Sequence, residues 1–355
     1  MPDAAALNLD VFFPLDLPAA AQGLPLSEFH TESIKPEGPP VSLQISLHHN
    51  WEAVDIGAVR PDALGFLEIK QFRLGGQPSA ALRVWMLALR WEVHPADLIA
   101  IWLSRAGHRR LAENRLKTPM GELPDFHTTH GRASHPLASR TVGLRHDQTL
   151  FVVQASLELE AFEPRAREIL FTLGSLRTVP PGKPTPIEKL GIHKLQSPAA
   201  RFSAPDSWKA ESRSCLRKPQ GDALLLTSQA PHMGPAAIGL ETIPDAPDFD
   251  AGLFLDALRR GLNRKGLVFG DPRISAGAPT QQISEVTRFE SLGMINSVSV
   301  EVLITVLRHE DDWAALWCLA PSSDQFGAAK AIARRAYELA CDSFQFVKPQ
   351  APPRR

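Results

Sequence analysis

The sequence is poor in tyrosine and cysteine and has no long apolar run. Its 355 residues include one Tyr, beside seven Trp and 17 Phe, and three cysteines that stand far apart, Cys215, Cys318 and Cys341. An odd number of widely spaced cysteines fits neither a disulfide framework nor a paired zinc motif. We therefore expect three reduced, structural thiols. Because no stretch of 18 apolar residues occurs, the sequence predicts no membrane-spanning helix.

An excess of charge of one sign is also missing. Lys and Arg number 38 and Asp and Glu 39, which leaves a formal charge of −1 and predicts no nucleic-acid partner. The first residues, Met1–Ala6, contain no positive region before an apolar stretch, so we expect no signal peptide and a cytoplasmic protein. Hydrophobic residues at 44% and charged residues at 22% predict a folded protein, and 31 prolines predict long loops.

The usual signatures of catalysis are absent as well. The sequence contains no Gly-x-Ser-x-Gly nucleophile elbow and no glycine-rich phosphate loop after a strand. It therefore predicts a protein that is not an enzyme and needs no cofactor.

One alternative is a metal-dependent hydrolase that uses a histidine cluster, His127, His130 and His135. Neutral imidazoles are common ligands of transition metals. The segment from Pro124 to Pro136 has the composition of a solvated loop, however, with no helix to fix the ligand directions. We therefore expect surface histidines and no metal.

A short motif occurs twice. The segment Leu144–Asp147, Leu-Arg-His-Asp, recurs as Leu307–Glu310, Leu-Arg-His-Glu, and both copies stand between apolar runs that are typical of strands. The pattern predicts the same hairpin in two places. A repeat of this kind points to an internal duplication.

Other landmarks recur in the same order. Trp51 corresponds to Trp208, a helix predicted near Pro95 corresponds to one near Asp248, and each copy closes with an amphipathic helix, the first with Pro164 in its first turn. The expected fold class is α+β, with two tandem antiparallel-sheet domains that carry helices packed on the sheet and form a pseudo-dimer by internal duplication. The expected ranges are a proline-punctuated N-terminal segment, 1–40; the first repeat, 41–179; a proline-rich linker, 180–200; the second repeat, 201–347; and a disordered tail, 348–355.

The second copy opens with Phe202-Ser203-Ala204-Pro205-Asp206-Ser207-Trp208, which resembles the Phe-x-x-Pro-x-x-Trp start of PsbP/DcrB-like α/β sandwiches. The resemblance covers roughly residues 41–179 and 201–347 and depends mainly on the order of elements. It implies antiparallel sheets with packed helices in a family of mostly non-enzymatic binding proteins. Among them, the Eag-type chaperones of type VI secretion are similar in lacking a signal peptide, and they shelter apolar segments of effectors. The first copy lacks the Phe-x-x-Pro lead-in.

A tryptophan-rich segment is the candidate partner-binding site. Strand alternation over Leu82–Trp91 places Trp85, Leu87, Leu89 and Trp91 on one face and apolar residues on the other. Either this is a central strand covered on both sides, or one face is open for a partner, because exposed aromatic patches mark interaction sites.

The sequence thus predicts a non-enzymatic protein-binding module. Its partner would be another protein, for which it acts as a cytoplasmic chaperone or adaptor that holds an apolar or transmembrane segment of a secreted effector. Beside the hydrolase, a structural scaffold subunit is a further alternative to the binding module.

Overall fold

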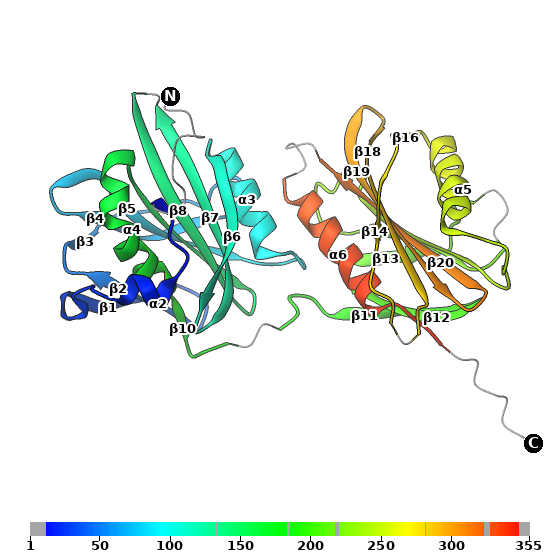
Figure 1. The fold of residues 1–355 in the computed structure, drawn as a ribbon, viewed down its shortest axis with the longest axis horizontal. Coiled ribbons are helices and arrows are strands. Elements are labelled where there is room, and N and C mark those ends of the chain that lie inside the picture. The colour runs from blue at the N-terminus through cyan, green and yellow to red at the C-terminus, as the bar shows by residue number, and fades with distance from the viewer. Residues whose placement is uncertain are drawn as a thin grey trace, which may run out of the picture. The chain divides into compact units, whose positions relative to one another are not determined.

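The computed structural model describes residues 12–132, 134–182, 185–216, 220–280, 282–322 and 327–347. The chain divides into two compact units: unit 1 comprises Met1–Arg90 and Pro95–Ile187, and unit 2 comprises Trp91–His94 and Glu188–Arg355. Both are α+β, built from antiparallel sheets with helices packed on them (Figure 1). No helix among the described residues is both long and apolar enough to cross a membrane.

Unit 1 contains a seven-stranded sheet and a three-stranded sheet. The strands of the large sheet, in spatial order, are β3 (Trp51–Val54), β4 (Leu67–Leu74), β5 (Gln77–Ala88), β9 (Thr149–Glu158), β8 (His135–His146), β7 (Gly121–Arg132) and β6 (Arg109–Thr118). Those of the small sheet are β1 (Phe29–Ile34), β2 (Ser42–His48) and β10 (Arg177–Val179). In β2, buried and partly exposed residues alternate, as expected for a strand with one face in the core.

Helices cover both faces of the large sheet in unit 1 (Figure 1). The short α2 (Leu17–Ala21) and the 3₁₀ helix η2 (Leu26–Glu28) precede β1, α3 (Pro95–Arg105) follows β5, and α4 (Leu159–Gly174) follows β9. The helix predicted near Pro95 begins there. The prediction for Pro164 was wrong: α4 begins at Leu159, so Pro164 lies beyond its first turn, and Phe162 in that turn is completely buried.

Unit 2 contains the same kinds of sheet. The large sheet consists of β13 (Trp208–Glu211), β14 (Ala223–Ser228), β15 (Ala237–Ile243), β20 (Asp312–Pro321), β19 (Val298–His309), β18 (Glu285–Ile295) and β16 (Leu267–Phe269), and β17 (Arg273–Ala276) also pairs with β18. The small sheet consists of β11 (Leu190–Gln196), β12 (Ala199–Pro205) and β21 (Gln345–Phe346). Its helices are α5 (Ala251–Arg264) and α6 (Ala329–Ser343). The carboxylate of Asp250 accepts a hydrogen bond from the Leu253 amide and caps α5.

The two units share one strand order. Reading across each large sheet, β13, β14, β15, β20, β19, β18 and β16 occupy the places of β3, β4, β5, β9, β8, β7 and β6. The predicted hairpins are confirmed as β8–β9 and β19–β20. Their turns are alike: the Arg145 side chain donates to the Asp147 carbonyl at 2.9 Å, and the Arg308 side chain to the Glu310 carbonyl at 2.7 Å.

The segments expected outside the two repeats contain regular structure. The range 1–40 includes α2, η2 and β1, and its residues Phe13, Ala20 and Ile34 belong to the hydrophobic core of unit 1. The range 180–200 includes β11. The predicted tail, 348–355, lies outside the described residues.

Candidate functional site

Three of the four residues of the tryptophan face predicted from the sequence are buried. Trp85 and Leu87 are 9% exposed and Leu89 is 5% exposed. The Trp85 ring packs edge-on against Trp102 of α3, with centroids 4.7 Å apart. The strand ends at Ala88, so Leu89 and the half-buried Trp91 lie beyond it. Trp102 of α3 therefore packs on the Trp85 side of β5, and a partner site at Trp85, Leu87, Leu89 and Trp91 stays a prediction.

The histidine segment was wrongly expected to be a loop. His127 and His130 belong to β7, and His135 begins β8 as an exposed residue. Residues three apart on a strand point to opposite faces. His127 therefore contributes to one face of the sheet and His130 to the other, and no group of three His, Cys, Asp or Glu side chains that could hold a metal occurs among the described residues.

His130 lies in a polar cluster on its own face. Its ring stacks on His108 at 4.1 Å, and its Nδ1 is 3.1 Å from the Ser139 hydroxyl. Burial lowers the pKa of both histidines to about 4, with the charge of Arg83 acting in the same direction. Ser139 is completely buried and also bonds Ser156, so its hydroxyl is a structural group rather than an accessible nucleophile.

His127 belongs to a buried ion cluster that the sequence analysis missed. Arg140 on β8 donates two hydrogen bonds to the carboxylate of Asp125, at 3.0 and 2.6 Å, and His127 approaches the same carboxylate at 3.2 Å. Burial alone would raise the pKa of Asp125, but the hydrogen bond with His127 and the charge of Arg140 outweigh it and hold that pKa below its usual value. The third contact of Arg140 is the carbonyl of Pro14, at 2.7 Å.

The cluster therefore anchors the N-terminal segment to unit 1. Phe13 is 3% exposed, its ring stacks on His127 at 4.2 Å, and it packs against Phe162 at 5.0 Å. Next, the Asp16 carboxylate accepts a hydrogen bond from the Ala19 amide and starts α2. We name residues 13–17 the strap, because they lie across α4 and the β7–β8 pair.

The strap ends in a close contact between two helices. A Cβ placed on Gly174, the last residue of α4, would lie 2.6 Å from a methyl group of Leu17. Only a residue without a side chain allows this approach. The contact fixes α2 beside the C-terminal end of α4.

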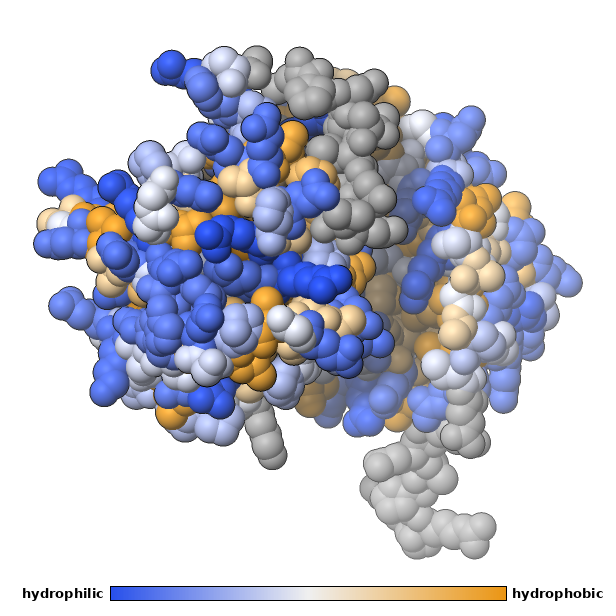
Figure 2. Space-filling view, turned by 60° about the vertical axis from the view of Figure 1, so that its left-hand side comes forward, coloured by the Kyte–Doolittle hydropathy of each residue, from blue (hydrophilic) through white to orange (hydrophobic). Residues whose placement is uncertain are grey.

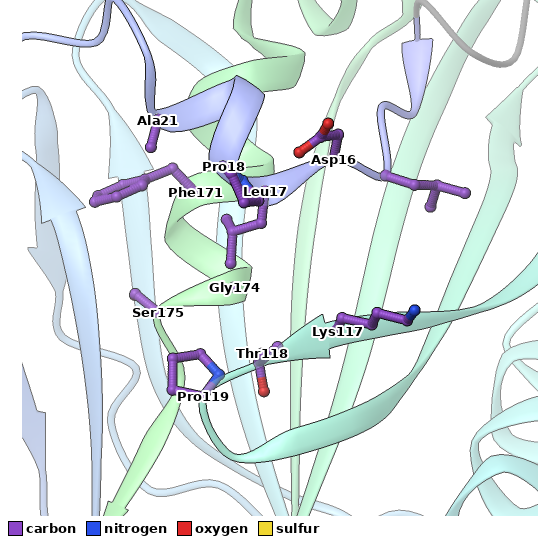
Figure 3. A pocket seen from close by; sticks show the side chains of 11 residues that line it. Asp16, Leu17, Pro18, Ala21, Lys117, Thr118, Pro119, Phe171, Gly174 and Ser175 are labelled. Carbon is purple, nitrogen blue, oxygen red and sulfur yellow. The ribbon is translucent and has the colours of Figure 1, made fainter.

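A groove opens below α2, between the end of α4 and the turn that joins β6 to β7 (Figure 3). Its cavity volume is about 670 Å³, within the range of ligand pockets. Leu17 points from α2 toward the β6–β7 turn (Figure 3). The lining is mostly apolar: Leu15, Leu17, Pro18, Ala21, Pro119 and Phe171, with the polar or small residues Asp16, Lys117, Thr118, Gly174 and Ser175.

Two polar side chains of the groove, those of Thr118 and Asp16, form hydrogen bonds within the protein, and Lys117 does not. The Thr118 hydroxyl donates to the Gly121 carbonyl and accepts from the Met120 amide, so it holds the turn. Asp16 is the cap of α2. Lys117 forms no hydrogen bond or ion pair with any residue that the structure describes. The groove thus offers apolar walls, the ammonium group of Lys117 and the carboxylate of Asp16, which keeps its charge when it accepts an amide hydrogen bond.

On one side of unit 1, the apolar side chains at the surface are scattered. On the side that Figure 2 brings forward, hydrophilic side chains predominate and apolar side chains form small, separate groups. A large apolar partner surface is not found on that side.

No protein-family model matches the chain, and no curated protein matches it. Among solved structures, it is similar to cyanobacterial PsbP (CyanoP) from Synechocystis sp. PCC 6803, with 11% identity and a TM-score of 0.34 over 45% of this chain and 94% of that one. It is also similar to the T6SS immunity protein TplEi from Pseudomonas aeruginosa, with 12% identity and a TM-score of 0.24 over 84% and 97% of the two chains. A third similar structure is the Tle4–Tli4 complex, with 12% identity and a TM-score of 0.25 over 91% and 99%.

PsbP, named above from a sequence resemblance, is thus among the structures that this chain is similar to, whereas likeness to Eag-type chaperones stays a prediction. With every TM-score below 0.5, these similarities assign no function to this chain.

Proposed function

We propose that the chain is a non-enzymatic protein-binding module and that the groove beside α2 holds an apolar segment of another polypeptide. The observation that carries the proposal is the apolar lining of this groove next to the unpaired Lys117. The client is the apolar segment of a secreted protein, for which this chain serves as a cytoplasmic chaperone or adaptor. The resemblance stated from the sequence supports this finer assignment.

The walls of the groove favour a chain of apolar side chains. Leu15 is 47% exposed and Phe171 is half-buried, so both have surface that a ligand can cover. Burying apolar area contributes about 25 cal/mol for each Å² removed from water. Large side chains of a client therefore supply most of the binding free energy here.

The charge at the edge of the groove selects the client further. Lys117 is exposed and forms no ion pair with any described residue, although Glu122 is its cross-strand neighbour, and the Asp16 carboxylate accepts a hydrogen bond from the Ala19 amide. A client with a carboxylate beside its apolar stretch complements this arrangement.

We further propose that the two units arose by tandem duplication. The shared strand order and the matching Arg-to-carbonyl bonds in the two hairpin turns support it. The helix ends match as well: the Ser175 hydroxyl accepts from the Ser46 amide and the Ser343 hydroxyl from the Ser203 amide, both at 2.8 Å.

Binding of a defined peptide tests the groove. The probe is a short, labelled peptide of leucine and alanine, made once with a free C-terminal carboxylate and once amidated, and fluorescence anisotropy reports binding to the full chain. We expect saturable binding, with the carboxylate form bound more tightly. Lys117→Ala should remove the difference between the two forms, because it removes the cation.

Two alanines of α2 form a matched pair. Ala21 lines the groove and Ala19 is exposed outside it. Ala21→Glu should abolish binding, because it places a charge in an apolar groove, while Ala19→Glu should leave it intact. If both variants bind the peptide as the unchanged protein does, the groove is not the site and the proposal is wrong.

A further inference from the structure

The shared topology makes positions of the two units directly comparable. The hairpin registers align His146 with His309, so that Arg140 corresponds to Leu303 and Val142 to Thr305. Across the next strand pair, Asp125 pairs with Val142 and Arg288 with Thr305; His127 pairs with Arg140 and Glu290 with Leu303. Asp125 therefore corresponds to Arg288, and His127 to Glu290.

The closing helices can be aligned in the same way. Ser175 and Ser343 make equivalent bonds to Ser46 and Ser203 at the ends of α4 and α6. Gly174, the residue on which Leu17 rests, therefore corresponds to Asp342.

In unit 1 the strap covers this surface at three points. The Phe13 ring lies on His127, the Pro14 carbonyl accepts from Arg140, and Leu17 lies on Gly174. These contacts bury an aromatic ring and satisfy a charged side chain.

In unit 2 the equivalent surface is a pocket. Its cavity volume is about 440 Å³, and all three equivalent residues line it, Glu290, Leu303 and Asp342. Further lining residues are His94, Arg288, Phe289, Ile304, Thr305, Arg334, Arg335, Tyr337, Glu338 and Cys341.

The pocket has a mainly polar and charged lining, in which Leu303 is an apolar contact. Leu303 replaces the buried Arg140, and the Tyr337 hydroxyl is paired with Thr305 at 2.7 Å. At the rim, the exposed side chains of Arg288, Glu290 and Asp342 form no hydrogen bond or ion pair with any described residue. Such a rim can meet the donors and acceptors of a main chain, and Leu303 can pack against one large side chain.

We infer that this pocket of unit 2 binds an extended segment of a partner polypeptide in the way that unit 1 binds its own strap. An aromatic residue of the segment takes the place of Phe13, over the paired residues Glu290 and Leu303, which correspond to His127 and Arg140. Where Leu17 rests on Gly174 in unit 1, the segment carries a basic residue, because Asp342 stands there in unit 2. The chain's own strap is engaged in unit 1, so the occupant comes from a different polypeptide. This second site is independent of the groove beside α2.

The test uses a peptide that copies the strap. A labelled peptide of residues 12–21 is compared with the same peptide carrying Leu17→Lys, and anisotropy gives the affinity of each for the full chain and two variants. The variants are Asp342→Asn in the pocket and Asp256→Asn, an exposed aspartate on α5 that does not line it.

On the unchanged chain, the lysine peptide should bind about fivefold more tightly than the unsubstituted one, as an exposed ion pair allows. On Asp342→Asn this preference should vanish, and on Asp256→Asn it should persist. The inference is overturned if neither peptide shows saturable binding, or if the preference survives in Asp342→Asn.

It is also overturned if the chain proves to be a dimer that excess peptide dissociates, because the occupant is then a second copy. Ala21→Glu, which blocks only the groove of unit 1, should leave these affinities unchanged, so failure of one site is distinguishable from failure of the other.

Discussion

At the residue scale, a buried charge needs its partners within hydrogen-bond reach. Alternation along β7 and β8 places Asp125, His127 and Arg140 among apolar residues that face the core. The sequence held a signal for this cluster, because Arg140 alternates with Ala138, Val142 and Leu144 on an apolar strand face. A charge at such a position requires an acid on the neighbouring strand. The Pro14 contact could not be predicted, since it depends on the packing of a distant segment.

The paired tryptophans show how duplicated positions diverge. The Trp51 indole donates to the carboxylate of Glu168 at 2.8 Å, whereas the indole nitrogen of the equally buried Trp208 has no partner within the described structure. The sequence predicted the correspondence of the two residues from their place before similar strands. It could not predict the difference, because the acid lies on a helix far along the chain.

The stacked histidines of unit 1 should make stability depend on pH. The pKa of His108 and of His130 is lowered to about 4 by burial, while in the unfolded chain each takes up a proton at its ordinary value of 6.5. The unfolded state then binds more protons between these values, so the free energy of unfolding should fall as pH decreases from about 6.5 to about 4. Above pH 6.5 this contribution is complete and constant.

Denaturant titrations at a series of pH values provide the measurement. His130→Gln keeps a polar side chain beside Ser139 but removes one titrating group, so its stability should decline less steeply over the same interval. An equal decline in both proteins would show that these histidines are not the source.

At the element scale, the hairpins were predictable because their signal is local. The repeated Leu-Arg-His-acid segment places an acidic residue at the turn with a positive φ, 48° at Asp147 and 55° at Glu310, and an arginine that bonds its carbonyl. The segment from Pro124 to Pro136 failed as a loop prediction for a physical reason. Both prolines lie near the ends of the β7–β8 pair: pairing begins at Asp125, one residue after Pro124, and Pro136 pairs with Gly131 next to the turn, where a missing amide weakens the ladder little.

The groove was not predictable from local patterns. Its walls come from α2, from the end of α4 and from the β6–β7 turn, which are far apart in the sequence. Prolines in the first forty residues indicated an irregular segment, whereas Phe13 and Ala20 enter the core. Packing between distant elements decided the outcome.

The contact between α2 and α4 predicts that the effect of Gly174→Ala on stability depends on the side chain at residue 17. Gly174→Ala should lower the free energy of unfolding by about 1–3 kcal/mol, because the new methyl group collides with Leu17. In a Leu17→Ala background the same change should be neutral or stabilising by up to about 1 kcal/mol, since alanine favours a helix over glycine. Chemical denaturation of the four proteins measures the coupling. Equal effects of Gly174→Ala in both backgrounds would contradict the close packing of these helices.

At the scale of the whole molecule, the sequence analysis correctly expected antiparallel sheets with packed helices. Recurrence of short segments in the same order was sufficient for this, because each segment has a strong local pattern. The sequence analysis did not predict the exact extent of each unit. Strand β11 lies within the range expected to be a linker. Residues 91–94 group with unit 2, although they stand between β5 and α3 in the sequence. Glu92 and Glu188 explain that grouping, since the amide of each donates to the carboxylate of the other, at 2.8 and 3.2 Å.

Because the two units have separate hydrophobic cores, we expect each unit to unfold independently of the other. One core cluster draws all its residues from unit 1 and the other draws all its residues from unit 2. Arg140→Met leaves Asp125 buried without its main partner and should lower the stability of unit 1 by about 3–5 kcal/mol. Asp250→Ala removes the cap of α5 and should lower the stability of unit 2 by about 1 kcal/mol. Hydrogen exchange of the full chain should therefore accelerate in β7–β9 for the first variant and in β18–β20 for the second, with the other unit unchanged.

Acceleration in both units by either variant would mean that the chain unfolds as one cooperative body, because exchange through global unfolding responds to a loss of stability anywhere in it.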